Sequence, residues 1–216
     1  MIAIIGGTGD EGLGLAMRFA AAGEAIVIGS RSHERAEAAA QKVREAVPKA
    51  TVEGAENPEA VRRAETVIIG VPYSGQRDTV TALKELIGSK LVINIVVPME
   101  FGQGGARAVA VEEGSAAEQT KAILGPDSRL VSAFHNLSAH ELMAVGKPLD
   151  CDVLVCGGDA ESRTQVIELA AKLPGCRGVD AGPLRNSRLI EDITVLLVGI
   201  NRRYKTQAGV RLVGLP

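Results

Sequence analysis

The sequence predicts a doubly wound α/β fold, in which helices cover both faces of a parallel sheet, and three observations support this. Short apolar segments alternate along the chain with longer amphipathic ones, separated by short joints. Hydrophobic residues make up 46% of the 216 residues and aromatic residues only 2%, so the core is built from the aliphatic side chains that buried parallel strands favour. A Gly-x-Gly-x-x-Gly pattern follows the first apolar segment, at residues 7–12.

The elements of the N-terminal half have recognisable beginnings and ends. Strands are expected at residues 2–6, 25–29, 51–54, 66–71 and 91–97. Helices are expected at residues 13–22, 33–47 and 76–87, with a further one opening at residue 57. Gly23 and Pro48 end the first two helices and Ser32 caps the second, while Asn57-Pro58-Glu59 is expected to supply the cap and first two positions of the third.

Residues 98–114 break this rhythm. Three glycines lie close together there, at positions 102, 104 and 105, and we expect a mobile loop or lid beside the site. Regular structure resumes with a capping box from Ser115 to Glu118, a strand over 130–135 and a short helix opened by Ser138.

The C-terminal part is predicted to be a small α/β extension. A strand over 152–157, a helix to Lys172, a short strand near Val179 and a last helix from Asn186 or Ser187 are expected. We place a boundary near residue 150, which gives a dinucleotide-binding domain over 1–150 and a smaller domain over 151–216. The last helix has a broad apolar face, which either the main domain or a second subunit must cover.

The glycine pattern is interpreted as a dinucleotide site of the Rossmann type. Gly7 is expected to allow the tight turn, Gly9 to let backbone N–H groups approach a diphosphate, and Gly12 to let the following helix pack closely. Thr8, Asp10 and Glu11 complete this turn, and the helix N-terminus faces the phosphates. By itself the pattern is weak evidence, because glycine-rich turns also occur for structural reasons.

The end of the second strand indicates which dinucleotide binds. An acidic residue at this position would select NAD, whereas this chain has Ser30 and Arg31, with Arg35 one helical turn further on. A guanidinium can hold the 2′-phosphate of NADP in a bidentate or stacked manner. The alternative is that both arginines are solvated charges at a helix start, but positive charge there opposes the helix dipole. The combination favours NADP(H) over NAD(H).

Composition and other motifs exclude several classes. The formal charge of −2, without basic clusters beside aromatic residues, argues against nucleic acid as a partner. The chain shows no signal peptide and no apolar run long enough for a membrane helix, so we expect a cytoplasmic protein without membrane contact. The three cysteines and three histidines lack the spacing of a metal site, and the cysteines are expected to be buried free thiols.

A nicotinamide cofactor then implies redox chemistry, and the second ligand belongs beside the nicotinamide. Three strand ends can form its pocket: Val71-Pro72-Tyr73, Val97-Pro98-Met99 and Ser132-Ala133-Phe134-His135-Asn136. Periodicity and composition do not identify the hydride acceptor.

Several longer motifs resemble those of the NADPH-dependent reductases of coenzyme F420, also called F420H2:NADP oxidoreductases. They are Ile-Gly-Gly-Thr-Gly at 5–9, Gly-Ser-Arg at 29–31, Gly-Ser-Ala-Ala-Glu at 114–118, Ser-Ala-Phe-His-Asn-Leu at 132–137, Cys-Asp-Val-Leu-Val-Cys-Gly at 151–157, Asp-Ala-Gly-Pro-Leu at 180–184, Asn-Ser-Arg at 186–188 and Arg-Tyr-Lys-Thr at 203–206. The resemblance spans essentially the whole chain, and its later motifs are the more specific ones.

This resemblance implies reversible hydride transfer between NADPH and the 5-deazaflavin F420 in a homodimer. It implies that the NADP phosphate is held by the residues matching Thr8, Ser30, Arg31 and Arg35, with Val71 and Pro72 beside the cofactor. The deazaflavin is expected near Val97, Pro98, His135 and Asn136.

His135 can donate a hydrogen bond to the accepting ring, or it can be a strand-end residue that bonds to backbone. The turn Tyr73-Ser74-Gly75-Gln76 departs from relatives with Trp and a His or acidic residue there, which affects the details of the pocket. Two other functions stay open: an NADPH-dependent reductase of another small acceptor, and a non-catalytic NADP(H) sensor.

Overall fold

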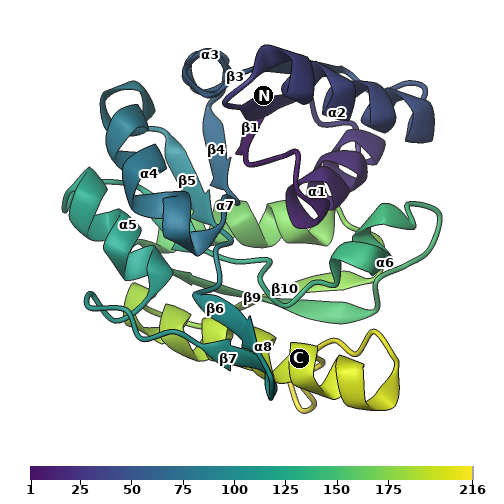
Figure 1. Cartoon of the computed structure of the whole chain (residues 1–216), viewed down its shortest axis with the longest axis vertical. Coiled ribbons are helices and arrows are strands. Elements are labelled where there is room, and N and C mark those ends of the chain that lie inside the picture. The colour runs from purple at the N-terminus through teal and green to yellow at the C-terminus, as the bar shows by residue number, and fades with distance from the viewer. Residues whose placement is uncertain (216) are drawn as a thin grey trace.

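The structure, a computed structural model, describes residues 1–215 and contains an eight-stranded sheet with helices on both faces (Figure 1). The strands lie in the order β10-β9-β8-β5-β4-β1-β2-β3. The strands from β3 to β8 in this order are all parallel, β9 is antiparallel to β8, and β10 is parallel to β9. The predicted doubly wound fold is therefore confirmed.

The strands of this sheet are β1 (Ile2–Ile5), β2 (Ile26–Ser30), β3 (Val52–Glu56), β4 (Thr66–Ile69), β5 (Leu91–Asn94), β8 (Leu130–Ser132), β9 (Cys151–Gly157) and β10 (Cys176–Asp180). The helices are α1 (Asp10–Ala21), α2 (His33–Ala46), α3 (Asn57–Arg63), α4 (Tyr73–Ile87), α5 (Ala116–Leu124), α6 (Ala139–Met143), α7 (Ala160–Ala171) and α8 (Ser187–Tyr204), with a short 3-10 turn at Leu184–Asn186.

Two hydrophobic cores follow from the alternation of side chains along the strands. Ile4 and Ile28 pack beneath α1 and α2, in a core that extends to α6 and α7. Ile5 follows Ile4 and Val27 precedes Ile28, and both belong to the core on the opposite face of the sheet, beneath α3, α4 and α5. A small third cluster places Ile190 of α8 against β9.

Three helix starts match the serine caps expected from the sequence, whereas α1 and α4 each begin three residues earlier than expected, at Asp10 and Tyr73. Ser32, Ser115 and Ser138 each accept a hydrogen bond from the backbone N–H three residues on, as N-caps do. Asn57 is not a cap, contrary to the prediction: Glu56 is the cap residue of α3 and Asn57 its first helical residue. The reason is that β3 runs directly into α3, so the last residue of the strand also caps the helix.

The segment expected to be a loop contains a β-hairpin. Strands β6 (Met99–Gly102) and β7 (Gly105–Ala108) pair antiparallel, and the Val109 N–H donates to the Pro98 carbonyl at the hairpin base. Glu100 and Arg107 face each other across the pair in a 2.6 Å salt bridge. Gly105 turns the chain with φ +109°, so the clustered glycines form the tight turn of the hairpin.

The residues after 150 extend the same sheet through β9 and β10. Helix α8 lies along the outer edge of the molecule, next to the hairpin and α5 (Figure 1). The three cysteines are free thiols; Cys151 and Cys156 are buried as expected, whereas Cys176 is only half-buried. Throughout residues 1–215, we find no helix with both the length and the apolar character needed to cross a membrane.

Candidate functional site

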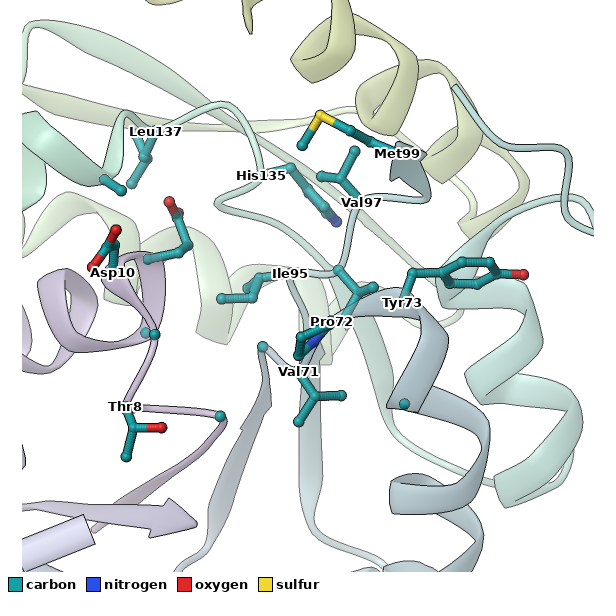
Figure 2. A pocket seen from close by; sticks show the side chains of 18 of the residues that line it. Thr8, Asp10, Val71, Pro72, Tyr73, Ile95, Val97, Met99, His135 and Leu137 are labelled. Carbon is teal, nitrogen blue, oxygen red and sulfur yellow. The ribbon is translucent and has the colours of Figure 1, made fainter. Parts of the chain in front are cut away.

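A cavity of about 1430 Å³ opens at the carboxyl ends of the parallel strands (Figure 2). It lies where the strand order reverses between β1 and β4, which is where ligands bind in open α/β sheets. Residues after β1, β2, β4, β5 and β8 all contribute to its wall.

Most of the predicted site residues line this cavity. They are Thr8, Gly9, Asp10, Glu11, Gly12, Ser30, Arg31, Arg35, Val71, Pro72, Val97, His135 and Asn136. Two predicted residues do not. Gly7 lies beneath the turn, where its N–H donates to the Ile4 carbonyl at 3.2 Å. Pro98 lines a separate cavity of about 260 Å³ at the base of the hairpin.

The glycine turn is built by close backbone contacts. The left-handed residue is Gly6, with φ +87°, rather than Gly7, and a Cβ there would lie 2.6 Å from the Gly70 oxygen. A Cβ at Gly12 would lie 2.8 Å from the Gly7 Cα, so α1 packs directly on the turn. No described side chain caps α1 at Gly9. The first N–H groups of α1 are therefore open to an anion from the cavity.

A cationic end of the cavity lies after β2. Arg31 and Arg35 are exposed, and within the part of the chain that the structure describes neither guanidinium forms a salt bridge or hydrogen bond through its side chain. Ser30, Glu56 and Asn57 lie beside them in the wall. Two free guanidinium groups next to a hydroxyl match the requirements of a phosphate monoester.

The backbone after β8 turns His135 toward the cavity. Phe134 has φ +67°, an uncommon conformation for a non-glycine residue, and its buried ring meets Phe19 of α1 edge-on at 5.6 Å between centroids. His135 is 3% exposed, and its Nε2 lies 3.4 Å from the Ser132 Oγ. Burial lowers the pKa of His135 to about 3, so the imidazole is neutral at physiological pH.

Asn136 has one satisfied end and one open end. Its Nδ2 donates to the Asp152 carbonyl at 2.7 Å, which links the site to β9. Its Oδ1 is buried without a partner. The side chain is thus held in place with an acceptor left over.

Unpaired polar atoms concentrate in this cavity. Within residues 1–215, six buried side-chain polar atoms lack a hydrogen-bond partner, and four of these belong to residues of the cavity wall. The four atoms are Glu11 Oε1, Asn57 Oδ1, His135 Nδ1 and Asn136 Oδ1. Because leaving such groups unpaired costs about 1–3 kcal/mol each, their clustering indicates that polar ligand atoms complete them.

Apolar residues line the middle of the cavity between these polar groups. Figure 2 shows Val71, Pro72, Ile95 and Val97 together at the strand ends with His135. A wall of this kind excludes water from a flat ring placed against it.

Tyr73, which the sequence placed at a pocket-forming strand end, lines the cavity at the start of α4, and its hydroxyl accepts a hydrogen bond from Gln119 at 3.3 Å. Several other wall residues were not predicted from the sequence. Helix α8 contributes Thr194 and Asn201, and the C-terminal segment contributes Gln207, whose amide oxygen accepts a 2.6 Å hydrogen bond from Ser138. No sequence signal pointed to these positions, because they reach the site only through the tertiary fold.

Among the described residues, no group of three His, Cys, Asp or Glu side chains is arranged to hold a metal ion. A doubly wound sheet with an open helix N-terminus, a cationic end and an apolar centre is typical of a Rossmann-type dinucleotide-binding protein.

Comparisons with known proteins identify the family. The family described as coenzyme F420-dependent NADP oxidoreductase matches residues 1–98. The F420-dependent NADP reductases of Methanothermobacter thermautotrophicus and Methanocaldococcus jannaschii are each 42% identical to this chain over 221 residues. The alignments cover 100% and 99% of this chain and 95% and 98% of the relatives. The chain belongs to the F420-dependent NADP reductase family.

The fold agrees with this assignment. A crystal structure described as a putative F420-dependent NADP-reductase from Arthrobacter sp. FB24 matches with a TM-score of 0.83 at 23% sequence identity. The match covers 98% of both chains.

Proposed function

We propose that the cavity holds NADP(H) and the deazaflavin ring of coenzyme F420 against each other. The chain is an oxidoreductase that transfers a hydride reversibly between NADPH and F420; in one direction NADPH, a proton and F420 give NADP⁺ and reduced F420. The observation that best supports one shared site is the set of unpaired polar atoms around its apolar centre.

NADP(H) is proposed to bind along the turn and toward β2. The open N–H groups of α1, with Thr8 and Gly9, would hold the diphosphate, while Arg31 and Arg35 would pair with the 2′-phosphate. Val71 and Pro72, at the end of β4, would then contact the nicotinamide. The N–H groups of α1 thus suit the diphosphate of NADP, and the two guanidinium groups suit its 2′-phosphate.

The deazaflavin is proposed to lie against Val97, His135 and Asn136. The unpaired His135 Nδ1 and Asn136 Oδ1 would take up polar atoms at the edge of its ring system. Pro98 is proposed to act indirectly, because it lies outside the wall and fixes the base of the hairpin that carries Met99.

The protein contributes chiefly position and environment to the reaction. Near-attack geometry requires the two reacting carbons to lie roughly 3 to 3.5 Å apart, and the apolar wall would press the rings together and exclude water. Because the nicotinamide itself carries the hydride, the reaction needs no covalent intermediate with a protein group. A neutral His135 can donate one hydrogen bond to charge that builds on the accepting ring, but it is not a source of protonic acid near pH 7.

We also propose an oligomeric state, a domain division and a location in the cell. Leu189 and Leu196 lie seven residues apart on α8, both 62% exposed, while Ile190 and Leu197 on the adjacent face are buried. An uncovered apolar stripe of this kind supports a homodimer through α8. Residues 151–216 are proposed as a smaller C-terminal domain that completes the F420 site, and the cytoplasm as the location.

A direct assay tests the function. Purified protein is mixed with NADPH and oxidised F420, and loss of the visible absorbance of the deazaflavin is followed, together with the reverse reaction. Turnover in both directions is expected. NADPH binding without turnover would favour the sensor function, and turnover of another small acceptor but not F420 would favour the other reductase function.

A further inference from the structure

Glu11 is a half-buried acidic residue in the wall of the cavity. It is the second residue of α1, directly after the glycine turn. Its Oε1 is buried and has no hydrogen-bond partner, which is unusual for a carboxyl group. The side chain is therefore incomplete in the free protein, at the place where the diphosphate is proposed to bind.

The position of Glu11 on α1 explains this burial. Residues 11, 14 and 18 share one face of the helix, and this face is covered by α6. A Cβ at Gly14 would lie 2.6 Å from the Leu142 Cβ, and the Arg18 guanidinium donates to the Leu142 carbonyl at 2.8 Å. The Glu11 Oε1 atom is buried at the N-terminal end of this packed face.

Nearby charges do not compensate for this burial. On α1 itself, Asp10 adds a further negative charge at the cavity and Arg18 is engaged by backbone carbonyls. On α6, His140 and Glu141 pair with each other at 3.3 Å.

The start of α2, the other helix beside α1, brings His33, Glu34 and Arg35, and Arg31 precedes it. None of these groups forms a salt bridge with Glu11 in the described chain. Burial raises the pKa of Glu11 to about 8, so most molecules carry a neutral carboxyl group near pH 7.

The ionisation state decides how this side chain meets an anionic ligand. A dinucleotide brings two negatively charged phosphates to the turn, and an ionised carboxylate beside them would repel them. A protonated carboxyl group instead has an O–H to donate, and its acceptor oxygen stays available to ribose or amide groups.

We propose that Glu11 is a protonated hydrogen-bond donor to the bound dinucleotide, so that binding of NADP(H) takes up a proton wherever Glu11 is ionised in the free protein. This inference rests on the proposed function, which places NADP(H) on the glycine turn. By linkage, affinity for NADPH falls as pH rises through the pKa of Glu11 in the free protein, by up to about tenfold per pH unit. A glutamine at this position donates at every pH and removes the dependence.

Calorimetric titration with NADPH at pH 8, in two buffers of different ionisation enthalpy, measures the protons bound with the ligand. This pH lies above the titration of the 2′-phosphate. We expect the wild-type protein to take up about half a proton and Glu11→Gln to take up none. Glu34→Gln, a change at an exposed glutamate near the start of α2, should retain the wild-type uptake.

Equal proton uptake by the wild type and Glu11→Gln would overturn the inference. Proton release by the wild type would also overturn it, because it would mean that Glu11 binds the ligand as a carboxylate. If Glu11→Gln does not fold, the wild type alone decides: uptake with affinity falling from pH 7 to 9.5 supports the inference, and constant affinity overturns it. Failure of every folded variant to bind NADPH at any pH would instead overturn the proposed function.

Discussion

The guanidinium of Arg18 on α1 donates a hydrogen bond to the Leu142 carbonyl of α6 at 2.8 Å, although the two residues are 124 positions apart in the sequence. Arg18 is 1% exposed and also donates to the carbonyls of Glu141, Ala144, Val145 and Lys147. One side chain thus anchors the segment after β8, which lines the cavity, to the helix of the glycine turn.

Arg18→Leu should strongly destabilise the protein. The change removes the donor of five hydrogen bonds to buried or partly buried carbonyl groups, and we expect the free energy of unfolding in urea to fall by about 3 kcal/mol or more. Arg62→Leu is the matched control, because Arg62 is exposed and, within residues 1–215, forms a salt bridge only with Glu59 on the same helix; its effect should stay within about 0.5 kcal/mol. Similar small effects for both would show that the carbonyl cluster does not depend on Arg18.

Arg31→Ala should weaken NADPH far more than NADH. Loss of a charge-assisted contact to the 2′-phosphate costs about 1.5–3 kcal/mol, which corresponds to an increase in KM for NADPH of about 10- to 100-fold. The KM for NADH should change by less than about twofold, since that cofactor lacks the phosphate. Lys42→Ala, at an exposed position of α2, should leave both values unchanged. Equal losses for the two cofactors would mean that Arg31 does not recognise the 2′-phosphate.

His135→Ala should lower kcat for F420 reduction while the protein stays folded. A positioned hydrogen-bond donor to developing charge contributes on the order of tenfold or more to the rate. Steady-state kinetics, with circular dichroism as a check of folding, measure this effect. An unchanged kcat would return His135 to a structural role beside Ser132.

His135 should also make the fold sensitive to acid. Its pKa is about 3 in the folded protein against an ordinary value of 6.5, so the unfolded chain binds the extra proton first. The contribution of the neutral imidazole is therefore fully present above pH 6.5 and is lost as pH falls toward 3, by about 1.4 kcal/mol per pH unit. Urea unfolding between pH 7 and 4.5 should lose stability less steeply in His135→Gln than in the wild type. Parallel curves would contradict the burial of a neutral ring.

Some features could be predicted from the sequence because local chemistry determines them. Buried parallel strands need continuous apolar segments, and serine caps need only a neighbouring N–H three residues on, so both appear in the sequence itself. His135 and Asn136 were placed near the site because they follow an apolar strand, and such strands end at the same edge of the sheet.

Other features depend on contacts between distant residues. The hairpin strands β6 and β7 are mostly exposed and are paired through Glu100 and Arg107, so they lack the apolar pattern of a buried strand. The glycine pattern likewise does not reveal that Gly6, rather than Gly7, has positive φ, because this follows from the close approach of Gly70, directly after β4. The contributions of Asn201 and Gln207 to the cavity depend on how α8 packs.

Isotope tracing shows whether the hydride passes directly between the two ligands in one cavity. NADPH carrying deuterium at both C4 positions is reacted with oxidised F420 in ordinary water, and the reduced deazaflavin is analysed by mass spectrometry and NMR. We expect one deuterium at C5 of the reduced deazaflavin for each turnover. Reduced F420 without deuterium would show that the hydrogen passes through solvent, and it would contradict direct transfer.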